Sequence, residues 1–535
     1  MNFDPLYNPY KTKRNVVYGK RGMVAASMPC AAEAGLAMLK KGGNAIDAAI
    51  AAAAALTVCE PTSNGVGGDA FAIVWSKGKL YGLNSSGPSP AGISADLLRS
   101  RGFREIPEYG WETVNVPGIP AAWAALSEKF GRLPFGELLE PAAEYAEGGY
   151  AVQPVLSFYW KKEYRRMKEA LEGDKFRHWF EAFAPGGKPP EAGEIFRLKE
   201  LAGTLRSIGE TKAESFYRGD LAERIDAFSR KTGGYLRKED LAAYRPEWVE
   251  PISVNYRGYD VFEIPPNGQG ITALMALNIL EGFDLAGCSG ADIAHRQIEA
   301  VKLAFEASLE HVADMRSMKM KVEDLLSDAF AEENRRRIGK EALMPEPSEH
   351  SDGGTVYLAA ADGEGNMVSY IQSNYIGFGS GLVVPGTGIA LHSRGRNFSF
   401  DGGHVNALEP NKRPYHTIIP GFLMKDGQPV GPFGIMGGFM QPQAHVQVLM
   451  NCIDFGLNPQ AALDAPRWIW MQGREVRTEE NFGKHLSDRL EERGHQVSID
   501  RDDLLFGRGQ IIWRDANGTL AGGTDSRADG AIYSW

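Results

Sequence analysis

The chain has 535 residues, of which 24% are charged and 63 are glycine, and its formal net charge is -10. This length allows several domains or one large multilayer domain with a substantial core, and the composition indicates a globular protein rich in loops. The negative charge argues against a nucleic-acid partner, because proteins that bind a phosphate backbone present a basic surface.

The cysteines and the apolar segments bear on the cellular compartment. Four cysteines lack any CxxC spacing and indicate buried free thiols, which fits a reducing compartment: Cys30, Cys59, Cys288 and Cys452. Residues 1–20 contain no apolar stretch of the kind found in signal peptides. The apolar run 45–58 includes Asp47 and falls short of the roughly 20 residues that a membrane span needs. We therefore expect a cytoplasmic protein with no membrane partner.

The first part of the chain is predicted to be mainly helical. Residues 23–26 predict a short strand, which two helices over 29–41 and 45–58 follow. The glycine-rich turn 64–69 resembles a dinucleotide-binding fingerprint, but an apolar strand over 70–75 follows it where that fingerprint requires a helix. We therefore reject dinucleotide binding. Further helices are expected to pack outside the sheets, over 121–130, 135–147, 221–232 and 295–313.

Strand patterns dominate after residue 355. Residues 356–361 and 367–372 flank the turn 362–366, which is a hairpin pattern. Other segments predict strands over 417–424 and 510–513 and a helix over 443–455. No internal repeat is evident. Two layers of sheet between two layers of helix, an α+β fold, is the most economical architecture for this order of elements.

The junction Gly353-Gly354-Thr355 has the pattern of an N-terminal nucleophile before its release. If the peptide bond before Thr355 breaks, Thr355 supplies a hydroxyl that attacks and an α-amine, with a pKa of about 7.7 to 8.0, that takes the proton. Gly354 lacks a Cβ and so permits a strained backbone in which this hydroxyl reaches the Gly354 carbonyl. The polar span 338–354 suits an exposed segment that leads to a cleavable bond. By itself, however, Gly-Gly-Thr more often marks an ordinary junction between a loop and a strand.

Further motifs occur in a fixed order along nearly the whole chain. They are GMVAAS at 22–27, GGNAIDAAIAAA at 42–53, EPTSNGVGGDAF at 60–71, VNVPG at 114–118, SFYRGDLAERI at 215–225, GGYLRKEDLAAY at 233–244, GGT at 353–355, PNKRP at 410–414, a glycine pair at 437–438 and APRW at 465–468. In this order and spacing the chain resembles the gamma-glutamyltransferase family of N-terminal nucleophile hydrolases, including its acylase-like branch.

The resemblance implies a four-layer αββα sandwich in which two parts form one intertwined domain. Residues 1–354 would form the large, helix-rich part with outer strands, and residues 355–535 the small, strand-rich part that begins with the nucleophile. Cleavage would occur between Gly354 and Thr355, and the free amine of Thr355 would act as its base. Gly437 and Gly438 match the oxyanion hole of the family, and Ser373 matches the residue that supports the nucleophile. No cofactor and no metal are implied.

Several positions depart from the pattern of the family. Asn84 and Asn397 stand where γ-glutamyl transferases use an arginine and an aspartate to bind the zwitterionic head of the substrate, so both charges are missing. Tyr375 stands where many members have asparagine, and His416 and Thr417 stand where the family has paired serines. Glutathione is therefore a doubtful substrate.

Two other features of the sequence bear on the size and the charge of the substrate. Only residues 400–409 separate the Asn397 motif from PNKRP, which is shorter than in members that fold a lid over the site, so we expect an open cleft that admits bulkier amides. Arg394 and Arg396 are candidates to bind a substrate carboxylate, because a guanidinium group suits bidentate contacts with it. Surface exposure or structural ion pairing is the alternative for each arginine.

Three hypotheses for function follow. The first is a self-processing amidohydrolase or acyltransferase of the acylase-like kind. It would remove glutaryl or related acyl groups from a small-molecule amide through an ester on Thr355. The second is a gamma-glutamyl hydrolase or transpeptidase acting on glutathione or other gamma-glutamyl compounds, and the third is a non-catalytic homologue that is never cleaved. No GxSxG or HExxH motif supports another hydrolase mechanism. After cleavage the large and small fragments are expected to stay associated, and a homodimer is a further option.

Overall fold

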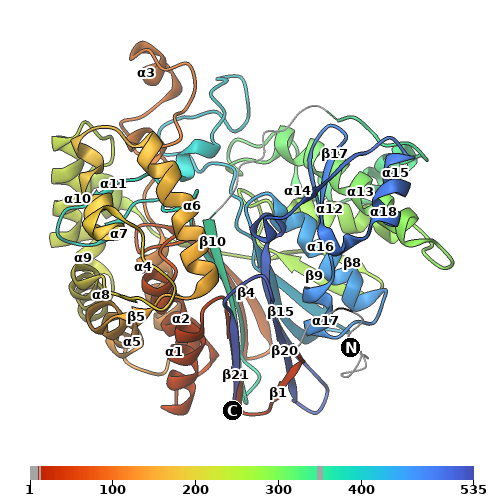
Figure 1. The fold of residues 1–535 in the computed structure, drawn as a ribbon, viewed down its shortest axis with the longest axis horizontal. Helices are drawn as coiled ribbons and strands as arrows, with labels where there is room; N and C mark the ends of the chain where they lie inside the picture. Colours follow the sequence, from red (N-terminus) through yellow and green to blue (C-terminus); the bar gives the residue numbers. More distant parts are fainter. Residues whose placement is uncertain (1–9, 11–13, 346–353) are drawn as a thin grey trace.

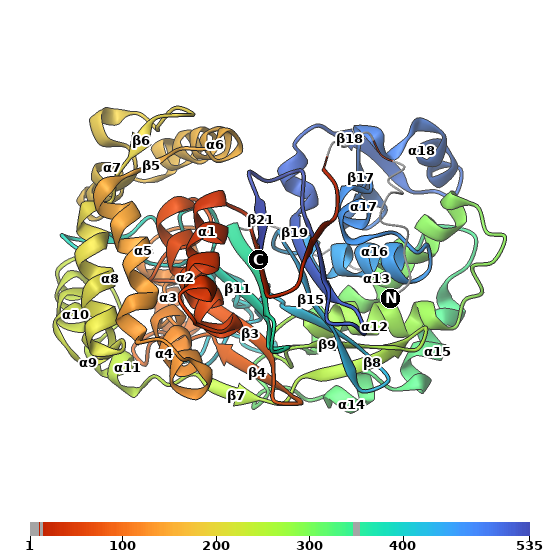
Figure 2. The same cartoon turned by 90° about the horizontal axis from the view of Figure 1, so that it is seen from below.

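The computed structural model describes residue 10, residues 14–345 and residues 354–535. Two seven-stranded sheets lie face to face at the centre of the molecule, and helices cover the outer face of each sheet (Figures 1 and 2). This arrangement confirms the αββα order expected from the sequence. Gly353 and the rest of the span 346–353 lie outside the described residues.

All neighbouring strands within the two central sheets are antiparallel. The first sheet has the order β21 (Ala531–Ser534), β2 (Gly22–Ala26), β10 (Gly354–Asp362), β11 (Met367–Tyr375), β3 (Asp69–Ser76), β4 (Lys79–Ser85) and β7 (Glu247–Val249). The second has the order β1 (Val17–Gly19), β20 (Leu520–Thr524), β19 (Arg508–Arg514), β15 (Gln428–Met436), β14 (Gly421–Lys425), β9 (Tyr259–Glu263) and β8 (Ile252–Tyr256). A smaller sheet consists of β16 (Trp468–Gln472), β17 (Glu475–Glu479) and β18 (Gln496–Asp500).

The helices form two groups, one on each side of the paired sheets (Figure 2). The group beside the first sheet contains α1 (Pro29–Lys40), α2 (Ala45–Cys59), α4 (Ile119–Phe130), α5 (Phe135–Gly148), α6 (Pro154–Ala170), α7 (Arg177–Phe183), α8 (Lys199–Thr211), α9 (Glu214–Arg218), α10 (Asp220–Lys231) and α11 (Lys238–Ala243). The group beside the second sheet contains α12 (Gly270–Glu281), α13 (Gly290–His311), α15 (Asp328–Arg337), α16 (Met440–Ile453), α17 (Pro459–Asp464) and α18 (Lys484–Glu491). Among the described helices, none combines the length and the apolar character needed to cross a membrane.

The predicted elements agree with the structure apart from their ends. The strand predicted over 417–424 begins only at Gly421, because Pro420 lacks the N–H that a paired strand needs. The helix predicted over 443–455 is α16, which starts three residues earlier at Met440. The glycine-rich turn 64–69 leads into strand β3, as expected when dinucleotide binding was rejected.

Strands from both sides of Thr355 occur in each central sheet. The hairpin β10–β11 begins at Gly354 and is inserted between β2 and β3, which come from the N-terminal part of the chain. In the second sheet, β14 pairs with β9 and β20 pairs with β1 across the same division. The two parts of the chain are thus interleaved within shared sheets.

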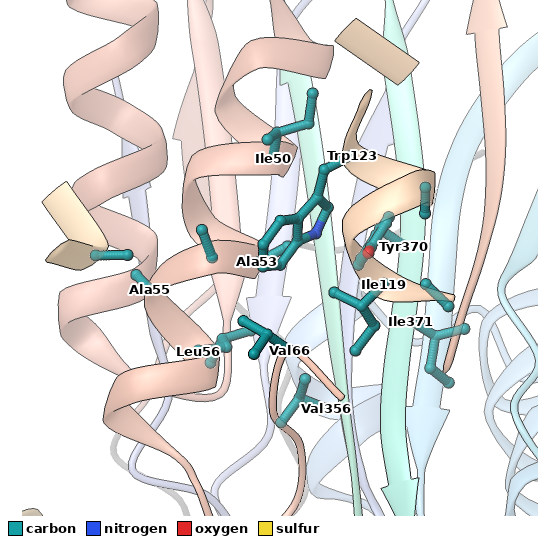
Figure 3. Close-up of a cluster of buried hydrophobic side chains, with 14 of the residues drawn as sticks. Ile50, Ala53, Ala55, Leu56, Val66, Ile119, Trp123, Val356, Tyr370 and Ile371 are labelled. Carbon is teal, nitrogen blue, oxygen red and sulfur yellow. The ribbon is translucent and has the colours of Figure 1, made fainter. Parts of the chain in front are cut away.

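Helix α2 shows how the sequence sets the distance between a helix and the sheet. The Asn44 side chain accepts hydrogen bonds from the N–H groups of Ile46 and Asp47, and the Asp47 carboxylate accepts one from the Asn44 N–H, which is a capping box. Every residue of α2 is buried, and its many alanines permit close contact with strands β10 and β11. Trp123 of α4 fills the space beside Ala53 and Tyr370 (Figure 3).

Two buried histidines connect α13 to the segment after α18. His295 Nε2 donates to the Gly339 carbonyl at 3.1 Å, so its Nδ1, 2.9 Å from His495 Nε2, must accept a proton from that nitrogen. The His295 imidazole therefore carries one proton and is neutral. His495 Nδ1 has no hydrogen-bond partner among the described residues, as expected of an unprotonated ring nitrogen. Burial lowers the pKa of His295 to about 4 and that of His495 to about 2.

This pair predicts a loss of stability in acid. A histidine whose pKa is depressed in the folded state stabilises the fold above its unfolded pKa of about 6.5 and loses that contribution as the pH falls. The variant His495→Gln can still donate a hydrogen bond to His295 but has no imidazole to protonate. Between pH 6.5 and 4.5 we expect its free energy of unfolding to fall by up to about 2.7 kcal/mol less than that of the natural protein. Chemical denaturation at both pH values measures this difference. A difference independent of pH would contradict the neutral state assigned to His495.

Candidate active site

Thr355 lies near the start of β10, where the sheet holds its hydroxyl beside that of Ser373. The two residues are cross-strand partners, and Thr355 Oγ1 is 3.1 Å from Ser373 Oγ. The pairing register shifts between Gly354 and Thr355, so the backbone is irregular at the expected cleavage site. Both side chains are buried in the unbroken chain, and Thr355 is only 1% exposed.

The hydrogen bonds of Ser373 determine the direction of each proton. Ser373 Oγ donates its single proton to the Gly354 carbonyl at 2.6 Å and accepts the N–H of Tyr375 at 2.8 Å. The Thr355 hydroxyl must then be the donor in its contact with Ser373. Its oxygen lone pairs remain free to attack, while the adjacent Gly354 carbonyl is polarised by a hydrogen bond.

The packing of neighbouring backbone around Gly354 favours glycine at this position. A Cβ at this position would lie 3.1 Å from the Thr62 carbonyl oxygen and 3.3 Å from the Gly377 Cα. Backbone atoms cannot move aside as a flexible side chain can, so the close approach of neighbouring backbone favours glycine here.

Gly437 and Gly438 lie between the end of β15 and the first turn of α16. Both have positive φ angles, 147° and 58°, which residues other than glycine rarely adopt. Among the hydrogen bonds of the described residues, none uses the N–H group of either glycine. The N-terminal end of a helix carries partial positive charge, which favours an anion at this position. The geometry therefore suits an oxyanion hole.

A buried carboxylate, Asp69, organises several of the predicted substrate residues. Asp69 is the cross-strand partner of Ser373 on the side opposite Thr355, so the three residues form a row across β3, β11 and β10. Asp69 Oδ2 lies 2.9 Å from His416 Nε2 and 3.2 Å from Arg394 Nε. Asp69 is not among the site residues predicted from the sequence, although an acidic residue at the head of an apolar strand is a usable signal.

Arg394 links this carboxylate to the wall of the site. Its Nη1 donates to Thr417 Oγ1 at 2.7 Å, and its guanidinium carbon lies 4.5 Å from the centre of the Tyr375 ring. Arg394 is fully buried and lies behind the cavity described below, as do His416 and Thr417. The structure thus brings four of the predicted residues together: Arg394, His416 and Thr417 lie behind the cavity, and Tyr375 lines it.

The charges in this cluster are balanced at neutral pH. Burial raises the pKa of Asp69, but His392, His416 and Arg394 outweigh that effect and hold it at about 2. Burial and the charge of Arg394 lower the pKa of His416 to about 3. An ionised Asp69 therefore faces one arginine and neutral imidazoles.

Two adjoining cavities open beside these residues. The larger, of about 890 Å³, is lined by Tyr375, Arg396 and Asn397 among others. The smaller, of about 210 Å³, is lined by Gly437 and shares a set of lining residues with the larger: Lys162, Phe439, Met471 and Arg477. Neither Thr355 nor Ser373 is among the described lining residues of these cavities.

Asn397 and Asn84 lie in different surroundings. Asn397 lines the larger cavity and donates to the Tyr415 carbonyl at 3.1 Å. Asn84 is buried, and its Nδ2 donates to Asn267 Oδ1 at 2.9 Å. The structure therefore does not bring these two predicted substrate residues together in the larger cavity.

One group of side chains in the described residues has donor atoms close enough to hold a metal ion. It consists of His295, Glu299 and His495, whose ligand atoms lie within 4.8 Å of one another. The buried Lys302 ammonium already binds Glu299 Oε1 at 2.8 Å, and the two imidazoles bind each other. A divalent cation would add uncompensated positive charge beside Lys302, so we assign this cluster a structural role.

Comparisons with known proteins agree with the geometry. The gamma-glutamyltranspeptidase family model matches residues 31–535. The crystal structure of cephalosporin acylase from Bacillus halodurans is 58% identical, with a TM-score of 0.96 and coverage of 100% of this chain and 99% of that chain.

Two proenzymes are similar over almost their whole length. The glutathione hydrolase-like YwrD proenzyme of Bacillus subtilis (strain 168) is 37% identical over 96% of this chain and 98% of its own. The oxamate amidohydrolase proenzyme of Klebsiella pneumoniae is 34% identical, with the same coverage of 96% and 98%. The names of these relatives refer to different amides but to one kind of precursor. The chain therefore belongs to the gamma-glutamyltranspeptidase family and is a self-processing amidohydrolase with the N-terminal nucleophile hydrolase fold.

Proposed function

We propose that Thr355 is the nucleophile of an acylase-like enzyme that hydrolyses an acyl amide through an ester on its own hydroxyl. The observation that supports this most directly is the contact of Ser373 with both the Thr355 hydroxyl and the Gly354 carbonyl. Because the fold already holds the nucleophile, the carbonyl and the hydrogen-bond donor together, the reaction does not incur the entropy cost of bringing them together.

The same contacts account for self-cleavage. Thr355 Oγ1 attacks the Gly354 carbonyl carbon, the bond from that carbon to the Thr355 nitrogen breaks, and an ester forms while the nitrogen takes a proton. Water then hydrolyses the ester. The products are a carboxylate on Gly354 and a free α-amine on Thr355, which has a pKa of about 7.7 to 8.0 and serves as the base in later turnovers.

In turnover, the α-amine takes the hydroxyl proton as Thr355 Oγ1 attacks the amide carbonyl of the substrate. The negative oxygen that forms lies at the N–H groups of Gly437 and Gly438. Fixed donors of this kind contribute roughly 3 to 4 kcal/mol to transition-state stabilisation. The amine half leaves with the proton, and water releases the acyl half as a carboxylic acid.

We assign the acyl half to the larger cavity, where Arg396 is available to bind a carboxylate. Arg396 lines this cavity and has no ion pair among the described residues, whereas Arg166 is paired with Glu108 and Arg477 with Asp500. Asn397 is neutral, so it offers no charge to a substrate ammonium group. Both features favour a glutaryl-type chain over a γ-glutamyl group. Hydrolysis of γ-glutamyl compounds is the second candidate, supported by the name of the YwrD relative.

The role of Thr355 is tested by two substitutions. We expect Thr355→Ala to abolish both self-cleavage and turnover because it removes the attacking oxygen. Thr355→Ser keeps the oxygen and should retain slow cleavage and activity. Denaturing electrophoresis measures the fragments 1–354 and 355–535, and amide hydrolysis measures turnover. Natural activity in the alanine variant would exclude Thr355, and an aged natural preparation with one unbroken chain would support a non-catalytic homologue.

Substrate preference is tested by two anilides that differ only in an α-ammonium group. The glutamates that line the larger cavity are ion-paired with Arg166 or Arg477: Glu108, Glu163 and Glu475. With asparagine at position 397, the ammonium therefore loses a charged hydrogen bond of about 1.5 to 3 kcal/mol, so we expect kcat/KM to be about 10 to 100 times higher for glutaryl anilide than for γ-glutamyl anilide. Asn397→Asp supplies a carboxylate and should narrow this ratio. A natural preference for the γ-glutamyl compound would refute the acylase-like specificity while leaving the nucleophile assignment intact.

A further inference from the structure

The smaller cavity is lined by Gly437, and Phe439 lines both this cavity and the larger one that holds the acyl-binding residues proposed above. Gly437 lines only the smaller cavity, whereas Tyr375, Arg396 and Asn397 line only the larger one. Phe439 and three other residues line both. A substrate whose carbonyl oxygen lies at Gly437 and Gly438 would therefore extend in two directions, with its acyl half in the larger cavity and its amine half in the smaller.

Arg508 is the most deeply buried cation on the wall of the smaller cavity. It is the first residue of β19 and pairs with Met436, the residue before Gly437. Its side chain is 8% exposed, and its Nε has no hydrogen-bond partner among the described residues. Among the described residues its ion pair is with Glu60, from Nη1 to Oε1 at 3.3 Å. The guanidinium group thus has hydrogen-bonding capacity left for a ligand.

The other charged groups that line this cavity already have partners. Lys162 Nζ lies 2.6 Å from Asp502, and Arg477 Nη1 lies 3.1 Å from Asp500. Glu60 contacts one nitrogen of Arg508, Nη1, and its other carboxylate oxygen accepts a hydrogen bond from Ser27 Oγ. The donor left for recognition in this cavity is the Arg508 Nε, which has no hydrogen-bond partner among the described residues.

The remaining walls are apolar. Their side chains come from the start of α16, from β16 and from the turn before β19: Phe439, Met440, Ile469, Met471, Leu504 and Leu505. Sites that bind small organic molecules typically combine apolar walls with a few polar groups that orient the ligand. A planar guanidinium group with free N–H donors matches a carboxylate.

We propose that the smaller cavity is the binding site for the amine half of the substrate, and that Arg508 selects amines with an apolar body and a carboxylate. This inference rests on the proposed function, because it takes the Gly437 and Gly438 N–H groups as the position of the reacting carbonyl. It makes Arg508 a specificity-determining residue for the leaving amine, independent of the acyl group.

The test compares two amides with the same glutaryl group, one of 3-aminobenzoate and one of aniline, amines of similar basicity. We expect kcat/KM of the natural enzyme to be at least 10 times higher for the aminobenzoate amide, mainly through a lower KM. Arg508→Gln keeps a donor for Glu60 but removes the charge, and the ratio should fall to within about threefold of one. Free 3-aminobenzoate should also inhibit the natural enzyme more strongly than aniline, a measurement that needs no variant to fold.

Arg477→Gln is the matched control, because Arg477 lines the same cavity but is paired with Asp500. This variant should keep the preference for the aminobenzoate amide. Equal rates for the two amides in a cleaved, active enzyme would overturn the assignment of the cavity, as would a preference that persists in Arg508→Gln or disappears equally in Arg477→Gln. Failure of the proposed function would look different: the protein would hydrolyse neither amide, or Thr355→Ala would hydrolyse both.

Discussion

The hydroxyl of Ser373 is the group on which the geometry at the cleavage bond depends. It donates to one side of the bond, at the Gly354 carbonyl, and accepts from the other side, at the Thr355 hydroxyl. A hydroxyl has one proton, so a single donation fixes the orientation of every other hydrogen bond around it. The antiparallel register of β10 and β11 holds these groups in place, and the reactive geometry is therefore a property of the sheet.

Behind this row, the molecule maintains a buried charge at the centre of the first sheet. An ionised carboxylate inside a protein is costly unless charged and hydrogen-bonding partners surround it. Asp69 has such partners in Arg394 and His416, which come from two separate segments of the chain. Arg394 in turn contacts Thr417 and the ring of Tyr375. The wall of the larger cavity is consequently tied to Asp69, the cross-strand partner of Ser373.

Much of this architecture was predictable from local patterns. The alanine-rich run 45–58 and the hairpin around residues 362–366 carry strong periodicity or turn signals, and both elements are confirmed. The apolar pattern predicts too early a start for β14, because it continues through Pro420, which cannot donate a hydrogen bond within a sheet. The motif order predicted the family and the enzyme class, which the comparisons confirm.

Contacts between distant segments could not be predicted from the sequence. The partners of Asp69 lie more than 300 residues away, as the spacing to Arg394 and His416 shows, and no local pattern connects them. For the same reason the sequence could not tell that Arg394 is already paired while Arg396 lines a cavity. The roles of Thr355, Ser373, Gly437 and Gly438 stay predictions, now with a defined geometry.

The interleaving of the two parts of the chain has a consequence for the life of the molecule. Once the backbone is severed, β10 and β11 would remain enclosed by β2 and β3 of a different polypeptide. A protein assembled while continuous and then cut loses the short connection that guided its strands into register. If heat or denaturant separates the pieces, reassembly becomes a bimolecular search that competes with aggregation. The mature form would thus persist through slow unfolding, and each molecule would be built only once.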